Sequence, residues 1–124
     1  MRRVMTNLLV SDVERAARFY EDLLGLSRTG DFGWFVILGH ADIAGLELGL
    51  LDRGHDIVPP DLRRAPAGVI LTFVVDDVDD MHDRARRMGV DILEPPRDLF
   101  YGQRRLLLRD PEGLVIDISS PVAP

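Results

Sequence analysis

The sequence has no cysteine and no lysine, and both absences narrow the chemistry that the chain can carry. Without cysteine there can be no disulfide, no thiolate metal ligand and no cysteine nucleophile, so any bound metal would need His, Asp or Glu. All fifteen basic residues are arginine. We attribute this to the base composition of a G+C-rich bacterial genome and not to function.

Long apolar runs and an excess of basic charge are also missing. No run approaches the ~18 apolar residues that a membrane span needs, and the first residues do not resemble a secretory signal. We therefore expect a cytoplasmic protein with no membrane partner. The formal net charge is −6, whereas nucleic-acid binding calls for a basic stripe, so we expect no nucleic-acid partner either.

The first half of the sequence contains a strand, a helix and three further strands. An apolar segment over 4–10 ends at Ser-Asp, a good N-cap pair, and apolar residues then recur at helical spacing over 13–24 before Gly25. Strand-like runs separated by turn residues follow at 26–29, 34–38 and 43–51. This order predicts a βαβββ unit.

The same order of elements returns in the second half. Residues 52–67 hold three prolines and little periodicity, which predicts a loop. A strand over 69–75 and a helix that begins after Asp77 and ends before Gly89 come next. Three more strands are predicted at 90–93, 104–108 and 114–118.

The repeated order predicts one α+β domain over residues 1–124, made of two tandem βαβββ modules, about 1–51 and 68–120, joined by the loop 52–67. One domain is expected because a chain of this length has one core. Each helix should cover one face of its own strands, since strand side chains alternate between two faces. We expect the faces left uncovered to form a cup-shaped mixed β-sheet with the helices on the outer face.

Three segments carry a resemblance to a known family. They are Asn-Leu-Leu-Val-Ser-Asp-Val-Glu-Arg-Ala-Ala-Arg-Phe-Tyr-Glu-Asp-Leu-Leu-Gly-Leu (7–26), Val-Val-Asp-Asp-Val-Asp-Asp (74–80) and Leu-Arg-Asp-Pro-Glu-Gly-Leu-Val-Ile-Asp (108–117). In this order they resemble the vicinal oxygen chelate superfamily, which includes glyoxalases, bleomycin resistance proteins and extradiol dioxygenases. The resemblance covers nearly the whole chain and implies the fold more strongly than the function, because one fold hosts many sites.

The resemblance also implies four metal-ligand positions, namely a His or Gln on the first strand and a carboxylate on the last strand of each module. The first-strand positions, seven residues before each helix N-cap, hold Met5 and Ile70, which cannot usefully bind a divalent ion. We place the last-strand positions at Glu47 and Asp117, which keep carboxylates. Two carboxylates alone would hold a catalytic metal loosely, so we expect neither a metal nor another cofactor.

The two acids define the predicted site. Gly45, Glu47 and Gly49 should share one face of their strand, and the small glycines leave room beside the carboxylate. The repeat places Asp117 across the cup from Glu47. Together the acids would form an anionic pocket floor, unless arginines such as Arg104 or Arg105 pair with them or the acids lie solvated at the rim.

Aromatic residues supply the other candidates. Trp34, the only tryptophan, alternates with its strand neighbours, and either set could face the cup. The stretch Phe-Tyr-Gly-Gln-Arg (100–104) resembles a segment of the bleomycin resistance proteins, which lack the metal histidines. The predicted ligand-binding residues are Asn7, Trp34, Glu47, Phe100, Tyr101, Arg104 and Asp117.

The first functional hypothesis is therefore a metal-independent protein that binds a small, drug-like, cationic or aromatic molecule, as the bleomycin resistance proteins do, and that forms a homodimer like such relatives. The second is a metal-dependent lyase, isomerase or dioxygenase in which Glu47, Asp117 and a displaced His40 or His55 hold the metal. The third is metal-free acid–base catalysis by the two carboxylates. Met5 and Ile70 argue against the second hypothesis.

Overall fold

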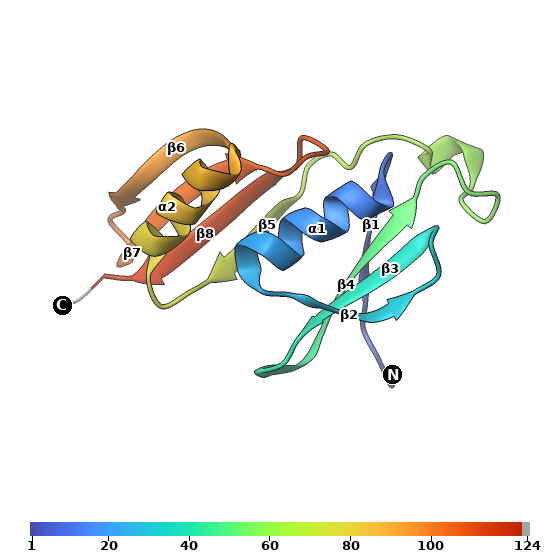
Figure 1. Cartoon of the computed structure of the whole chain (residues 1–124), viewed down its shortest axis with the longest axis horizontal. Coiled ribbons are helices and arrows are strands. Elements are labelled where there is room, and N and C mark those ends of the chain that lie inside the picture. Colours follow the sequence, from blue (N-terminus) through green and yellow to red (C-terminus); the bar gives the residue numbers. More distant parts are fainter. Residues whose placement is uncertain (123–124) are drawn as a thin grey trace. The chain divides into compact units, whose positions relative to one another are not determined.

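The structure, a computed structural model, describes residues 1–122. The chain divides into two compact units, Met1–Pro66 and Ala67–Pro124, and each contains a four-stranded mixed sheet and one α-helix (Figure 1). The prediction of an α+β fold made of two βαβββ modules is confirmed, whereas a cup formed by the two sheets stays a prediction. Among the described residues, no helix is both long and apolar enough to cross a membrane.

The first module has the strand order β1-β4-β3-β2. Its elements are β1 (Thr6–Val10), α1 (Val13–Leu24), β2 (Ser27–Asp31), β3 (Phe35–His40) and β4 (Ile43–Asp52). The first strand pairs in parallel with the last, and the remaining neighbours are antiparallel. This arrangement places β1 at one edge of the sheet and β4 beside it.

The second module repeats this topology with the order β5-β8-β7-β6. A 3₁₀ turn, η1 (Pro60–Leu62), lies in the segment before it, and its elements are β5 (Ile70–Val74), α2 (Val78–Met88), β6 (Asp91–Asp98), β7 (Gln103–Arg109) and β8 (Val115–Pro121). Again the first strand is parallel to the last. The connection from β7 to β8 is a tight turn, in which the amide of Gly113 donates to the carbonyl of Asp110.

Each helix begins and ends as the sequence predicts. Asp12 and Asp77 are the N-caps, and their carboxylates accept backbone N–H groups of the first turn. Gly25 and Gly89 are the C-caps and both have the left-handed conformation, with φ of 69° and 74°. The identical signals explain why the two modules could be recognised as a repeat.

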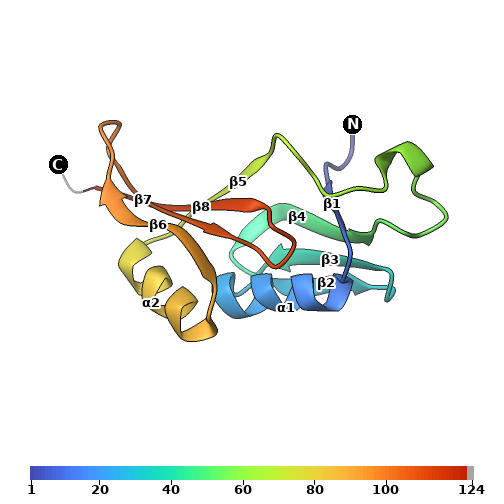
Figure 2. The same cartoon turned by 90° about the horizontal axis from the view of Figure 1, so that it is seen from above.

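Each helix covers one face of its sheet, as Figure 2 shows. Helix α1 packs against β3 and β4, and α2 packs against β6, β7 and β8. The fully buried side chains of α1 include Ala16, Ala17, Tyr20 and Leu23. Because a strand's side chains alternate, each sheet keeps a second face that its own helix does not cover. We call this second face the open face of the module.

Several strands run past their predicted ends, and β6 does so by the most residues. Strand β6 was expected over 90–93 but continues to Asp98 through Pro95 and Pro96. It is an edge strand, with β7 as its neighbour on one side, and its register with β7 shifts around Glu94. An edge strand with an irregular register tolerates proline because fewer backbone N–H groups are needed for pairing.

The C-cap glycine of α1 allows a test of backbone conformation alone. A Cβ added at Gly25 would meet nothing within 4 Å, so the cost of Gly25→Ala comes from the positive φ. We expect the free energy of unfolding, measured with urea, to fall by about 1 kcal/mol. Gly25→Asn should cost less, because Asn tolerates this conformation.

The matched control is Gly54→Ala, at a loop glycine for which no positive φ is found and whose added Cβ would lie 3.4 Å from Asp52 Oδ1, an ordinary contact. Its effect should stay within about 0.5 kcal/mol. Equal stability of the Gly25→Ala variant and the wild type would contradict the assignment of this cap.

Candidate functional site

The strand register defines the open face of module one. Asn7 on β1 lies opposite Gly49 on β4, and Gly49 lies opposite Ile37 on β3. Phe35 and Glu47 are two residues away from this row along β3 and β4, so they share the face. The alternate residues of β4, such as Leu48 and Leu50, are buried on the side of α1.

Gly49 is the point of closest packing on this face. A Cβ at this position would lie 2.1 Å from Asn7 Oδ1 and 2.8 Å from Phe35 Cε1, both far closer than real contacts allow. The space that the sequence predicts beside Glu47 is therefore filled, at Gly49, by the protein's own Asn7 and Phe35. Because Gly49 has no side chain, the amide of Asn7 and the ring of Phe35 can lie next to each other at this position.

Four aromatic rings form a stack near Phe35 on the open face of module one. They belong to Phe32, Trp34, Phe35 and His55. Trp34 lies in the bend before β3, and its ring centroid is 4.1 Å from that of His55 and 5.8 Å from that of Phe35, with interplanar angles of 18° and 29°. Phe35 stacks in turn on Phe32 at 6.3 Å and 13°. Phe32 lies at the end of these near-parallel rings and is 61% exposed. Such an array can be extended by another flat ring.

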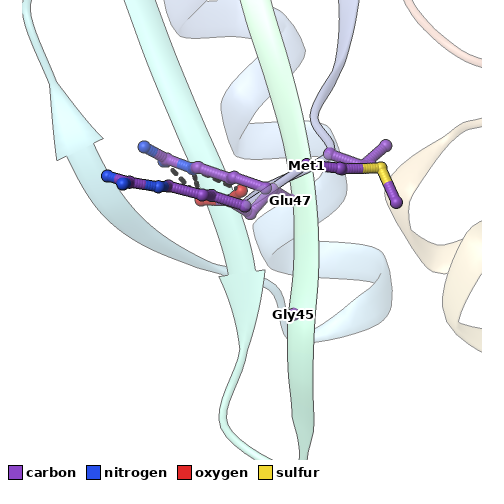
Figure 3. Close-up of a pocket in the computed structure, with 6 residues that line it drawn as sticks. Met1, Gly45 and Glu47 are labelled. Carbon is purple, nitrogen blue, oxygen red and sulfur yellow. Dashed lines mark hydrogen bonds and ion pairs between the residues drawn. The ribbon is translucent and has the colours of Figure 1, made fainter.

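At the other end of the face, Glu47 is engaged by an arginine that the sequence did not single out. Arg3 Nε donates to both carboxylate oxygens, at 2.9 Å to Oε1 and 2.6 Å to Oε2, and Nη2 also donates to Oε1. Both residues line a cavity of about 340 Å³, together with Met1, Arg2, Val4 and Gly45. Figure 3 draws the lining residues of this cavity. The Glu47 side chain is only 19% exposed.

This ion pair shifts the pKa values of both Glu47 and Arg3. The hydrogen bonds from Arg3, together with its charge, hold the pKa of Glu47 below its usual range, and partial desolvation opposes the shift. The pKa of the Arg3 guanidinium is raised by the same hydrogen bonds and charge. Glu47 is therefore an ionised and neutralised carboxylate. Glu47 is thus paired with an arginine, but with Arg3 and not with Arg104 or Arg105.

The register corrects the comparison of the two last strands. Thr6 pairs with Leu48, which places Met5 opposite Glu47, whereas Ile70 pairs with Val115. The counterpart of Glu47 in module two is thus Val115. Asp117 lies opposite Thr72 and is the counterpart of Gly49. The sequence comparison matched Glu47 with Asp117, two residues beyond its true counterpart. It did so because the number of residues between the first and last strands differs between the modules.

The donor set implied by the family resemblance therefore does not fit a divalent metal. Three of the four positions hold Met5, Ile70 and Val115, and the fourth is Glu47 in its ion pair. Within either module of the described chain, no three His, Asp or Glu side chains gather closely enough to bind a metal ion.

The two histidines proposed as displaced ligands each have a local partner. His40 ends β3, and its Nδ1 accepts the backbone N–H of Asp42 at 3.1 Å. His55 lies in the segment after β4, where its Nδ1 accepts the backbone N–H of Ile57 at 3.2 Å and its ring stacks on Trp34. Both imidazoles are thus oriented by contacts other than Glu47.

In module two, Asp117 and Arg104 lie on opposite faces of the sheet. Asp117 is on the open face, where Thr72 and Ser119 donate to it at 3.2 and 2.6 Å. Arg104 is on the α2 side, where it forms ion pairs with Asp79 and Asp98, each at 3.1 Å. Since Leu107 lies opposite Asp117 and the side chains of β7 alternate, Arg104 does not share the face of Asp117. A ligand-binding role for Arg104 stays a prediction.

Phe100 and Tyr101 form the tip of the β6–β7 hairpin. Their rings make an edge-to-face contact at 5.3 Å, and the two residues are 100% and 52% exposed. Gly102 closes the turn with φ of 86° and donates its N–H to the carbonyl of Leu99. A ligand-binding role for this aromatic pair stays a prediction.

Several residues of the open faces were not predicted. Arg3 precedes the first strand and carries no motif, and Phe35 was only the alternating neighbour of Trp34. In module two, Gln103 Oε1 and Arg105 Nε lie two residues apart on β7, and both atoms are buried without a hydrogen-bond partner among residues 1–122. Period-2 alternation could have found Phe35, whereas nothing local marks Arg3.

Two βαβββ modules, each with a parallel pairing of its first and last strands, define the class of protein. The chain matches the Glyoxalase/Bleomycin resistance protein/Dioxygenase superfamily over residues 2–118. It belongs to this superfamily, and the resemblance seen in the sequence is confirmed at that level.

Similar proteins include a virulence protein of Salmonella typhimurium, which is 28% identical over 120 residues, covering 93% of this chain and 81% of that protein. Its crystal structure has a TM-score of 0.74 at 27% identity and 98% coverage of both chains. A protein of unknown function from Agrobacterium tumefaciens has a TM-score of 0.78 at 26% identity, covering 98% of this chain and 95% of that one. A possible glyoxalase from Bacillus cereus has a TM-score of 0.71 at 25% identity, with coverages of 95% and 97%.

The close packing at Gly49 predicts a coupled pair of substitutions. Gly49→Ala forces the ends of the Asn7 and Phe35 side chains to move, since the new Cβ would lie 2.1 Å from Asn7 Oδ1 and 2.8 Å from Phe35 Cε1. It should lower the free energy of unfolding by about 0.5–1.5 kcal/mol, the cost of an off-rotamer side chain. Asn7→Ala removes the nearer clash. The double variant should therefore lose less stability than the sum of the single variants, and strict additivity in a double-mutant cycle would contradict this packing.

The Arg3–Glu47 pair predicts a pH dependence. Because the folded pKa of Glu47 is lowered, its contribution to stability is fully present above its unfolded pKa of roughly 4.3 and is lost as the pH falls through the folded pKa. The stability difference between wild type and Glu47→Gln, measured with urea from pH 7 to pH 3, should thus stay constant above about pH 5 and shrink below about pH 4. In an Arg3→Gln background the dependence should flatten, and an unchanged slope there would assign the effect to another partner.

Proposed function

We propose that this superfamily member is a metal-independent protein that binds a small aromatic molecule on the open face of module one. One observation supports the proposal above all others. Three of the four positions that the family resemblance assigns to metal ligands are apolar, and the remaining one, Glu47, carries Arg3. A binding function needs affinity alone and does not depend on those ligands.

The aromatic array gives the ligand its chemical class. Trp34 lies between His55 and Phe35 in a near-parallel stack, and the exposed Phe32 ends that stack. Offset stacking of flat rings contributes about 0.5–1.5 kcal/mol per pair beyond the area that it buries. A planar aromatic ligand would extend the array across its exposed end.

Asn7 supplies polar recognition beside the rings. Its amide lies over Gly49 next to Phe35, and an amide offers both a donor and an acceptor. A ring substituent with complementary hydrogen-bonding groups would fix the orientation of the ligand. We therefore propose an aromatic ligand with a polar substituent, and not a cation, because a cation could reach Glu47 only by displacing Arg3.

The two catalytic alternatives have less support. A metal-dependent enzyme would have to assemble its ligands from Glu47, Asp117 and either His40 or His55, and each of these side chains is already held by a local partner. Acid–base catalysis by Glu47 would favour a raised pKa near neutral pH, whereas Arg3 lowers it. A homodimer, as in bleomycin resistance proteins, remains part of the proposal and would be seen as a doubled mass in solution.

Trp34 fluorescence tests the binding proposal directly, because this is the only tryptophan and it lies within the stack. Planar aromatic compounds with amide or phenol substituents should quench or shift its emission in a saturable way. Phe35→Leu should raise the Kd about tenfold or less, since one stacked pair contributes about 1 kcal/mol. The Kd should not change when EDTA, Mn²⁺ or Ni²⁺ is added.

Leu93→Ala is the control, because it removes an exposed apolar side chain from module two and should leave this Kd unchanged. Binding that requires a divalent metal and disappears with EDTA would overturn the proposal in favour of a metal-dependent enzyme. Binding weakened equally by both substitutions would place the ligand elsewhere than on the stack.

A further inference from the structure

We propose that Arg3, held in place by Glu47, forms a binding site for a carboxylate group in the cavity at the start of the chain. The family resemblance assigns a metal ion to the carboxylate of Glu47. In this chain the guanidinium of Arg3 binds that carboxylate instead. The site is separate from the aromatic stack, and the proposal does not depend on the function proposed above.

The hydrogen bonds of Arg3 show which of its edges is occupied. Nε–H contacts both oxygens of Glu47, at 2.9 and 2.6 Å, and Nη2 donates to Oε1. The side-on edge formed by Nε and Nη2 is therefore bound to the carboxylate. Nη1 makes no hydrogen bond within residues 1–122, so the end-on edge formed by Nη1 and Nη2 keeps donors for another partner.

The cavity beside Arg3 has room and positive charge. It measures about 340 Å³, and its lining contains Arg2 and Arg3 but one acidic side chain, Glu47 (Figure 3). Gly45 contributes no side chain, and a Cβ there would meet nothing within 4 Å. The charged side chains of the lining therefore sum to a net positive charge, because Glu47 neutralises one of the two arginines.

Glu47 gives Arg3 a fixed orientation that a surface arginine lacks. The carboxylate is only 19% exposed and comes from β4, whereas the Arg3 side chain is 57% exposed. A flexible side chain normally loses conformational freedom when it binds a ligand. The existing ion pair has already restricted part of that freedom, so less of it is left to lose when the end-on edge binds a ligand.

The chemistry of the end-on edge selects the ligand. Two roughly parallel N–H donors match the two oxygens of a planar carboxylate, and such paired, charge-assisted hydrogen bonds are stronger than neutral ones. A divalent cation is disfavoured for two reasons. Arg2 and Arg3 would repel it, and Met5, which lies opposite Glu47, offers it no suitable ligand atom. The expected ligand group is therefore an organic carboxylate.

Acetate is the probe, since it has no ring that could bind to the aromatic stack, and acetamide is its neutral isostere. Titration of the full chain, followed by ¹H–¹⁵N NMR, should shift the Arg3 Nε–H and the Gly45 and Glu47 amides with acetate but not with acetamide. Arg3→Gln should weaken acetate binding about tenfold or more, and Arg3→Lys should have an intermediate effect. Arg86→Gln on α2 changes the net charge equally and should leave acetate binding unchanged.

Glu47→Gln distinguishes a held guanidinium from simple positive charge. The substitution makes the cavity more positive, so attraction by charge alone would strengthen acetate binding, whereas loss of the orienting ion pair should weaken it at least threefold. Stronger binding in Glu47→Gln, or equal losses in Arg3→Gln and Arg86→Gln, would overturn the proposal. Quenching of Trp34 by aromatic compounds should be unaffected by Arg3→Gln, so failure of either proposal is recognised separately.

Discussion

The parallel pairing of the first strand with the last in each module is the constraint on which the rest of the structure depends. It places Asn7 opposite Gly49, and Thr72 opposite Asp117. Because strand side chains alternate with a period of two, one register decides for a whole strand which side chains face the helix and which lie on the open face. Both the core beneath the helices and the candidate site above the sheet follow from this pairing.

The two open faces have diverged although the modules share one topology. Module one has an amide, stacked rings and a neutralised carboxylate, whereas module two has Asp117 hydrogen-bonded to two hydroxyl groups. The superfamily fold tolerates such differences because the open-face positions do not contribute to the helix–sheet core. Substitution there changes the site and leaves the packing of buried residues such as Leu50 and Ile116 intact.

Electrostatics in module one depends on a residue outside any regular element. Arg3 lies before β1, and its contact with Glu47 joins residues 44 positions apart in the chain. Without this contact Glu47 would be a partly buried, uncompensated carboxylate, and a cationic ligand would be the natural expectation. With it, the same position becomes part of a cavity with positive charge, which is why we propose an anionic ligand group there and not a cation.

The sequence by itself determined the α+β class, the two βαβββ modules and the ends of both helices, because Asp12, Gly25, Asp77 and Gly89 act through local backbone hydrogen bonds and φ preferences. It also identified Asn7, Trp34 and Glu47 as residues of one module. Only the tertiary structure decided that Arg104 faces α2, that Asp117 corresponds to Gly49 and that Arg3 pairs with Glu47. These facts depend on register and on contacts between distant residues, which a one-residue shift changes without any change in local pattern.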